Sequence, residues 1–134
     1  MGLIEELGTF LDSESTRFAL GSSLFLNWLP SEPGTAASII ETGGLAPAYT
    51  FGTDLPRYEN ARIQLLCRST SSTRARANAN DAWIQLQEVT NESLSARSWL
   101  RVSAVQSVFS LGQDEQGRWI FGCNYDCIRM TTAA

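Results

Sequence analysis

Two residue types that are common in active sites are missing from this chain. The sequence contains neither histidine nor lysine, so all ten of its positively charged side chains are arginines. Histidine is the usual proton shuttle near neutral pH and the commonest metal ligand, and lysine supplies Schiff bases and phosphate contacts. Their absence excludes Ser-His-Asp and Cys-His catalysis and the kinase type of phosphate transfer. What remains is chemistry by carboxylates alone, or a role in binding and assembly.

The fourteen carboxylates do not form the pattern of a known carboxylate enzyme. Glycosidases need two facing carboxyl groups in a cleft, and divalent-metal nucleases need clustered Asp and Glu. Six of them lie on a predicted surface helix or in a predicted turn (Glu5, Glu6, Asp12, Glu14, Asp114, Glu115). Asp126 lies on a predicted strand, but no acidic residue is near it in sequence. We therefore expect no catalytic residues and no cofactor, with a small carboxylate-dependent enzyme as a less favoured alternative.

The three cysteines are predicted to be free thiols in the core. Cys67, Cys123 and Cys127 are odd in number, and a reducing compartment keeps thiols free. Cys123 and Cys127 lie on one predicted strand, where four residues span about 13 Å. That separation is too large for a disulfide or a shared metal ion. We therefore expect no metal site.

The bulk composition predicts one domain over residues 1–134. With 43% hydrophobic residues the chain can build a core, and its net charge of −4 argues against tight binding of nucleic acid. No apolar run reaches the length of a membrane span, and the N-terminus lacks the basic start of a signal peptide. These features indicate a cytosolic protein without membrane contact.

The spacing of apolar residues predicts the elements of the first half. Leu3–Leu11 has the period of an amphipathic helix, with Glu5, Glu6 and Asp12 on its polar side. Leu24–Leu29 reads as a strand that ends at Pro30. A turn at Pro33 and Gly34 then leads into a strand over Ala36–Glu41, and the short gap predicts an antiparallel hairpin.

The second half adds a helix and three strands. Arg62–Arg68 alternates, with Ile63, Leu65 and Cys67 on a buried face. A helix follows over Arg74–Thr90, and strands over Trp99–Phe109 and Arg118–Met130 are joined by a turn between glycines. The apolar stripe of that helix is predicted to contain Ala75, Ala79, Ala82, Trp83, Leu86 and Val89. The order indicates an α+β fold, a mostly antiparallel sheet of about five strands with two helices packed on it.

Candidate interface residues lie in an irregular segment and on two charged faces. Thr42–Asn60 is rich in Gly and Pro and carries Tyr49, Phe51 and Tyr58, which suit a protein interface or cover an edge of the core. One face of the predicted strand shows Arg62, Gln64 and Arg68, and the first helix shows Glu5, Glu6 and Asp12. Arg74 and Arg76 precede acidic residues on their helix, which is typical of surface charge rather than a nucleic-acid site. The candidate interface is Tyr49, Phe51, Tyr58, Arg62, Arg68 and Arg74.

Several of these pieces occur together in a known family. They are the opening helix Leu3–Leu11, the strand Leu24–Leu29 before Pro30, and Ile39–Gly44 followed by Pro47. The strand Ala61–Arg68 with its helix and the segment Phe109–Arg118 with its return strand complete the set. In size and element order the chain resembles the tail terminator proteins of tailed bacteriophages, some of which are called minor capsid proteins.

This resemblance implies a structural role without catalytic residues. It implies a hexameric ring that caps the tail tube at its final length and then meets the head-neck connector or a stopper protein. DNA passes through the centre of such a ring without specific binding, and the acidic balance fits that passage because like charges repel. The expected location is the tail-neck junction of the virion, after assembly in the host cytoplasm. Another neck component, a head completion or stopper protein, is the alternative.

Overall fold

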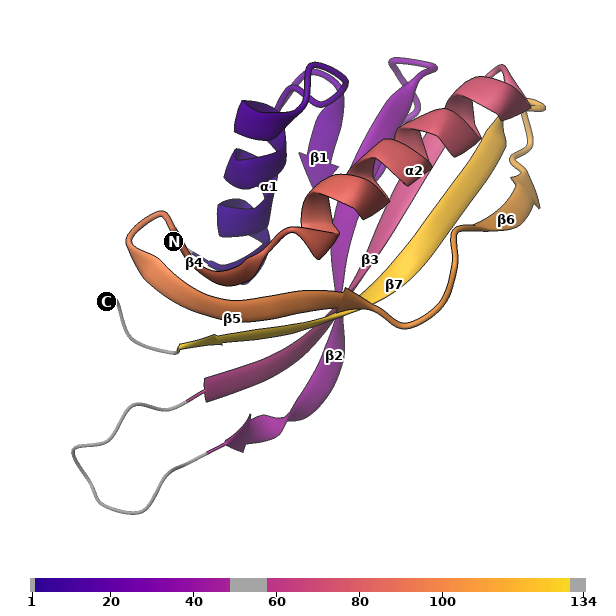
Figure 1. Cartoon of the computed structure of the whole chain (residues 1–134). Coiled ribbons are helices and arrows are strands. Elements are labelled where there is room, and N and C mark those ends of the chain that lie inside the picture. Colours follow the sequence, from indigo (N-terminus) through magenta and orange to yellow (C-terminus); the bar gives the residue numbers. More distant parts are fainter. Residues whose placement is uncertain (1, 49–57, 131–134) are drawn as a thin grey trace.

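A sheet with two helices on one of its faces forms the body of the molecule (Figure 1). The computed structural model describes residues 2–48 and 58–130. Their elements are α1 (Leu3–Glu14), β1 (Leu24–Leu26), β2 (Ala36–Ala48), β3 (Tyr58–Ser69), α2 (Ser72–Gln87), β4 (Thr90–Leu94), β5 (Arg97–Ala104), β6 (Phe109–Gln113) and β7 (Trp119–Met130). The predicted α+β class with two helices is confirmed, whereas the sheet has seven described strands instead of about five.

The sheet is mixed rather than purely antiparallel, because its first two strands run in the same direction. The strands lie in the order β1-β2-β3-β7-β5-β4, with β6 also paired to β7, and β1 pairs parallel with β2. The predicted antiparallel hairpin is therefore wrong. The prediction placed one tight turn at Pro33 and Gly34, but the chain already turns at Asn27, which has a φ of 66°. Residues 27–35 carry the chain back, so that β2 starts level with β1.

The segment after α2 was the least well predicted. The helix ends at Gln87 instead of Thr90, and residues 90–94 form the edge strand β4, which the sequence did not indicate. The β4–β5 hairpin turns through Ser95 and Ala96, both with positive φ. Such turns are usually marked by Asn-Gly or Asp-Gly, so the usual signal is absent here. The predicted strand Trp99–Phe109 is interrupted, and β5 and β6 pair with successive halves of β7.

The core lies between the helices and the face of the sheet that they cover. On β3 the alternating residues Ile63, Leu65 and Cys67 are fully buried, as predicted, and the odd-numbered residues of β7 from Phe121 to Arg129 face the same way. Small side chains on α2 let that helix lie close to β3 and β7. Trp83 was predicted to share this stripe, but it is 38% exposed. No helix in the described ranges is long and apolar enough to cross a membrane.

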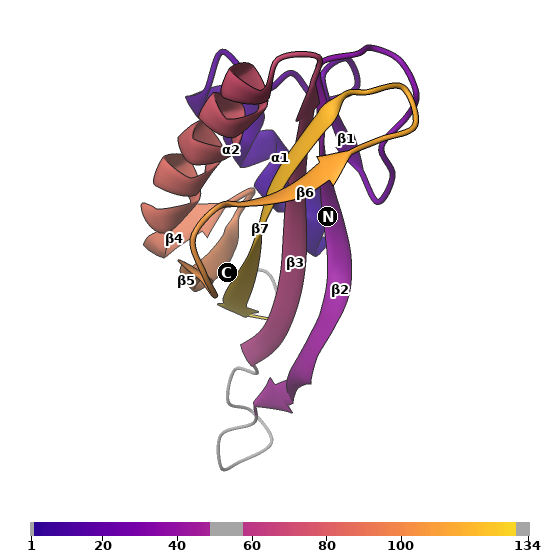
Figure 2. The same ribbon diagram turned by 90° about the vertical axis from the view of Figure 1, so that its right-hand side faces the viewer.

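The predicted irregular segment Thr42–Asn60 is partly regular. β2 continues to Ala48 and β3 begins at Tyr58, so the two strands extend beyond both helices (Figure 2). Their pairing shifts by one residue between Glu41 and Gly43, where Gly43 has a φ of 106°. At Gly44 a Cβ atom would lie 2.4 Å from the carbonyl oxygen of Asn60. Gly43 therefore provides the left-handed backbone conformation of the bulge, and Gly44 allows the two strands to approach closely beside it.

Candidate assembly surfaces

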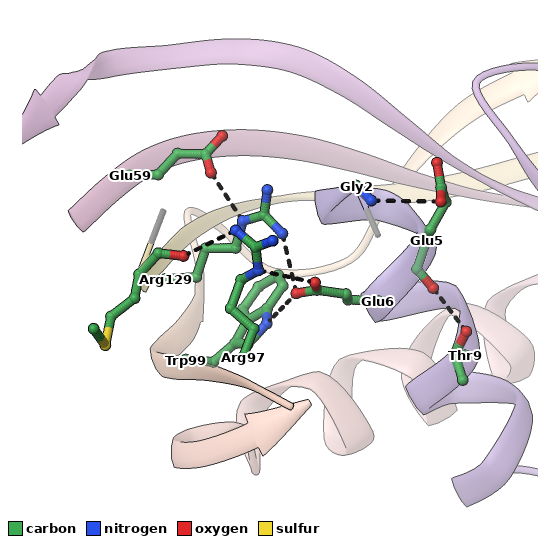
Figure 3. A network of polar contacts seen from close by, with 9 residues as sticks. Gly2, Glu5, Glu6, Thr9, Glu59, Arg97, Trp99 and Arg129 are labelled. Carbon is green, nitrogen blue, oxygen red and sulfur yellow. Dashed lines mark hydrogen bonds and ion pairs between the residues drawn. The ribbon is translucent and has the colours of Figure 1, made fainter. Parts of the chain in front are cut away.

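A buried cluster of charges, the Glu6 cluster, joins α1 to the ends of β3, β5 and β7 (Figure 3). It contains Glu6, Glu59, Arg97, Trp99 and Arg129. Glu6 Oε1 accepts hydrogen bonds from Trp99 Nε1 at 2.8 Å and Arg129 Nη1 at 3.0 Å, and its Oε2 lies 3.1 Å from Arg97 Nε. Arg129 Nε also donates to Glu59 Oε2 at 2.8 Å.

The Glu6 side chain is only 1% exposed, which corrects its predicted place on the polar face of the first helix. Glu6 is buried together with its helix neighbours Leu3 and Leu7, and two arginines on the neighbouring strands β5 and β7 provide it with partners. A buried carboxylate is tolerated when it is paired and hydrogen-bonded in this way. The cluster contains two acids and two arginines, so it is balanced in charge and its role is to fix α1 on the sheet. Among the described residues, the predicted acidic face reduces to Glu5 and Asp12.

The predicted arginine face of β3 is also reduced, because Arg68 is buried. Arg68 donates to the carbonyl oxygen of Pro33 at 2.7 Å and to that of Gly34 at 3.3 Å, and it is 3% exposed. Burial, with the nearby Arg118 as a second cause, lowers the pKa of Arg68. Arg118 holds the same loop through the carbonyl oxygen of Ser31. Both arginines therefore anchor residues 27–35 over the outer face of the sheet, which leaves Arg62 and Gln64 as the exposed part of the predicted face.

Arg62 lies in the open half of the outer face, opposite the helices. Its Nε donates to Asp126 Oδ1 at 2.8 Å, and the two side chains are 48% and 52% exposed. This hydrogen bond raises the pKa of Arg62. A hollow of about 440 Å³ lies beside the pair, lined also by Thr42, Gly44 and Arg101. The arrangement provides charged groups on an open surface, which suits contact with another protein.

The other predicted interface residues are spread over separate places. Tyr49 and Phe51 lie outside the described residues. Tyr58 is half-buried at the start of β3, opposite Met130 of β7. Arg74 is exposed in the first turn of α2, where its backbone N–H is capped by Ser71 Oγ. The structure does not bring Arg74 and Arg62 together, because α2 and the outer face lie on opposite sides of the sheet.

Two exposed apolar patches were missed by the sequence analysis. The β1 patch consists of Phe25 and Trp28, whose rings meet edge to face with centroids 6.1 Å apart, and Trp28 is 60% exposed. The α2 patch consists of Trp83 and Ile84, which are 38% and 52% exposed. Trp28 was interpreted as part of a strand and Trp83 as part of a core stripe. Their exposure was indicated only by neighbouring residues. Pro30 follows Trp28, and the polar Asn80 and Gln87 lie one helical turn on either side of Trp83.

The three cysteines carry free thiols and are buried, and the prediction of their burial is confirmed. Burial raises the pKa of the Cys67 thiol to about 12, and burial also raises the pKa of Cys127. A thiol with so high a pKa is not a nucleophile at neutral pH. Within residues 2–48 and 58–130, no three Cys, Asp or Glu side chains gather as they would around a metal ion.

The whole fold, rather than one site, is similar to that of a chain in a solved virion structure. A chain in the virion of a native gene transfer agent particle superposes with a TM-score of 0.66, at 16% sequence identity, over 96% of this chain and 94% of that chain. No curated protein matches the sequence. The sequence profile of the family described as bacteriophage tail terminator protein matches residues 5–130. The chain therefore belongs to the bacteriophage tail terminator family, as the resemblance implied, and is a structural protein of a phage tail.

Proposed function

We propose that this protein forms a hexameric ring that caps the tail tube at its final length and joins the tail to the head-neck connector. The proposal rests on membership of the tail terminator family, whose profile matches residues 5–130. A fold in common with a virion component supports it. The ring would lie at the tail-neck junction of the virion, after assembly in the host cytoplasm, and DNA would pass through its centre.

Stopping a polymer requires two unlike faces on one subunit. A tube of stacked rings grows as long as each new ring offers the same surface to the next ring. A terminator matches the tail tube protein on one face and presents a different face to the connector or stopper protein. The chain has surfaces that differ in this way: the outer sheet face with Arg62 and Asp126, and the helix side with Glu5, Asp12 and Arg74. Tyr49 and Phe51, which follow β2 in the sequence, and Tyr58 at the start of β3 are proposed to contribute to one of these contacts.

The proposal is tested with a phage that lacks this protein. We expect DNA-filled heads and separate tails that fail to attach, with tubes beyond the normal length, measured by negative-stain electron microscopy. A plasmid copy of the wild-type chain should restore joined particles of normal tail length. Normal-length tails joined to heads in the absence of the protein would refute the terminator role. Tails of normal length that stay unjoined would favour another neck component, such as a head completion or stopper protein.

A sharper version of the test changes the proposed contacts alone. The double variant Tyr49→Ser and Phe51→Ser should fold normally but fail to restore head-tail joining in the deletion phage. Thr50→Ser in the same segment is the matched control and should restore joining. Full restoration by the double variant would remove these two aromatic residues from the proposed interface.

A further inference from the structure

Among the described strands, β6 is the sheet edge that is least protected against pairing with another strand. Its residues, Phe109–Gln113, carry no charge, and it pairs with β7 alone. The edge of β1 is covered, because the backbone N–H and C=O of Leu24 both bond to residues 19–21. The edge of β4 contains Asn91 with a φ of 51° and an exposed charge at Glu92. Proteins protect edge strands with such features, so the unprotected edge of β6 indicates a partner strand.

A hollow lies on the helix side of β7, next to this edge. It has a volume of about 450 Å³ and is lined by Phe121 of β7 and, on α2, by Ser72, Thr73, Arg76, Ala77 and Asn80. The backbone of Phe121 pairs with Ser110 of β6. The other flank of α2 faces α1, since Asp81 accepts a hydrogen bond from Ser15, the residue that follows α1. The hollow therefore opens on the flank away from α1, and Figure 1 shows α1 and β6 on opposite sides of α2.

The two faces of a strand added to β6 would meet different groups. On the helix side, the Cζ atom of Arg76 lies over the ring of Phe121, 6.0 Å from its centroid, and Arg76 makes no ion pair with the described residues. The exposed Ser110 is short, so it leaves room for a longer side chain from an added strand. On the outer side, Leu111 is 47% exposed and lies over Gly122. A complementary strand would therefore alternate acidic and apolar side chains.

We propose that β6 binds an extended segment of another virion protein as an added strand. The acidic side chains of this segment face Arg76 in the hollow, and its apolar side chains face Leu111. In such strand addition, main-chain hydrogen bonds hold the segment and alternate side chains select it. A second copy is a poorer occupant, because the other described edges are covered at β1 or broken at Asn91 of β4. The inference rests on the proposed assembly role and assigns one of its contacts.

Two short synthetic peptides test the chemistry of this site. One alternates glutamate with valine, the other alternates lysine with valine, and both are labelled with fluorescein. In fluorescence anisotropy, the wild type should bind the glutamate peptide at least about tenfold more tightly than the lysine peptide. The net charge of the chain is −4, which favours the opposite order. The expected preference therefore reports the local site rather than the overall charge.

Substitutions on each face of the site have matched controls. Arg76→Gln should weaken binding of the glutamate peptide about tenfold, whereas Gln85→Glu, which lowers the net charge equally on the flank of Asp81, should not. Leu111→Lys should also weaken binding about tenfold, because a lysine on an edge strand opposes pairing. Val105→Lys is its control, since Val105 is also 47% exposed but precedes β6. Circular dichroism should show the same fold in all four variants.

Amide hydrogen exchange, followed by nuclear magnetic resonance, shows where the glutamate peptide binds. The N–H groups of β6 that face away from β7 should exchange at least about tenfold more slowly with the peptide bound, and those of β4 should not change. The inference is wrong if the wild type fails to bind the glutamate peptide at millimolar concentration. Equal binding of both peptides, unchanged binding by Arg76→Gln or Leu111→Lys, or slower exchange at another edge would also overturn it.

The wild type alone provides the last test. Exchange at β6 should not depend on protein concentration. If these N–H groups become protected as the concentration rises, the edge pairs with a second copy and the inference is wrong. None of these measurements uses the deletion phage, whose tail length tests the terminator role separately, so the two failures are distinguishable.

Discussion

The Glu6 cluster and the Arg62–Asp126 pair use the same chemistry in opposite surroundings. Arg129 and Glu6 are 8% and 1% exposed, whereas Arg62 and Asp126 are 48% and 52% exposed, at similar nitrogen–oxygen distances of 3.0 and 2.8 Å. A buried ion pair is costly to break because one charge is left without a partner, while an exposed pair is screened by water and contributes little to stability. The Glu6 cluster therefore stabilises the fold, whereas the Arg62–Asp126 pair is accessible to a partner protein.

The largest effect is expected from breaking the Glu6 cluster. Glu6→Gln keeps the size of the side chain but removes the negative charge that faces Arg97 and Arg129. We expect a loss of about 3–5 kcal/mol in the free energy of unfolding, measured by urea denaturation. Glu5→Gln, an exposed neighbour on the same helix, is the control and should change it little. An equally small change for Glu6→Gln would show that burial does not separate the two ion pairs.

An intermediate effect is expected at the β6–β7 turn, which lies between these extremes of exposure. The backbone N–H of Arg118 is the main cause that lowers the pKa of Asp114, with further hydrogen bonds from its guanidinium and from the N–H of Gln116. A carboxyl group with a lowered pKa adds stability that is present above its unfolded pKa, near 4, and is lost as pH falls through the lower folded value. Asp114→Asn should therefore be less stable than the wild type at pH 7. The difference in the free energy of unfolding between the two proteins should become smaller below about pH 4. A difference that stays constant between pH 7 and pH 2 would contradict this.

A smaller effect on stability is expected at the exposed pair. Asp126→Asn should leave the urea midpoint unchanged, because water already surrounds both side chains. The same variant should nevertheless reduce head-tail joining in the complemented deletion phage, if the outer face contacts a neighbouring protein. Ser103→Ala, opposite Asp126 on β5, is a nearby control. A marked loss of stability in Asp126→Asn would place this pair with the Glu6 cluster instead.

The smallest effect is expected at the buried thiols. An ordinary cysteine is largely ionised at pH 9, but Cys67, with its pKa raised to about 12 by burial, stays protonated. Raising the pH from 7 to 9 should therefore leave the folded protein almost unreactive to a thiol reagent such as Ellman's reagent. All three cysteines should react in urea. Rapid labelling of the folded chain at pH 9 would show that this part of the core opens readily.

The parts of the fold that were predicted are those in which the local pattern and the tertiary structure agree. β3 and β7 alternate cleanly, so their buried faces could be read from the sequence. β4 could not, because its turn uses Ser95 and Ala96 in a conformation that usually calls for Asn or Gly. The return of the chain to a parallel β2 could not be read either, because the loop that makes it is bound by Arg68 of β3 and by Arg118 just before β7, both far along the chain.

The candidate interface was predicted less well for a similar physical reason. A carboxylate on the polar side of a helical period looks the same whether water or a distant arginine faces it, so Glu6 was assigned to the surface. Arg68 lies on the opposite face of β3 from the buried Ile63 and Leu65, which is where an exposed residue is expected. The loop that buries it is remote in sequence. Trp83 was assigned to the core because an apolar side chain at helical spacing is usually buried. Whether such a side chain is buried depends on which part of the helix surface the sheet covers, and the local sequence does not show this.

The central claim, that this chain is the ring that ends the tail, is tested most directly by locating it in the virion. Electron cryomicroscopy of the phage, with this fold fitted into the density without imposed symmetry, would show where and how many copies are present. We predict one ring of six copies between the last ring of the tail tube and the head-neck connector. Copies repeated along the tube, a ring inside the neck away from the tube, or a different symmetry at this position would contradict it.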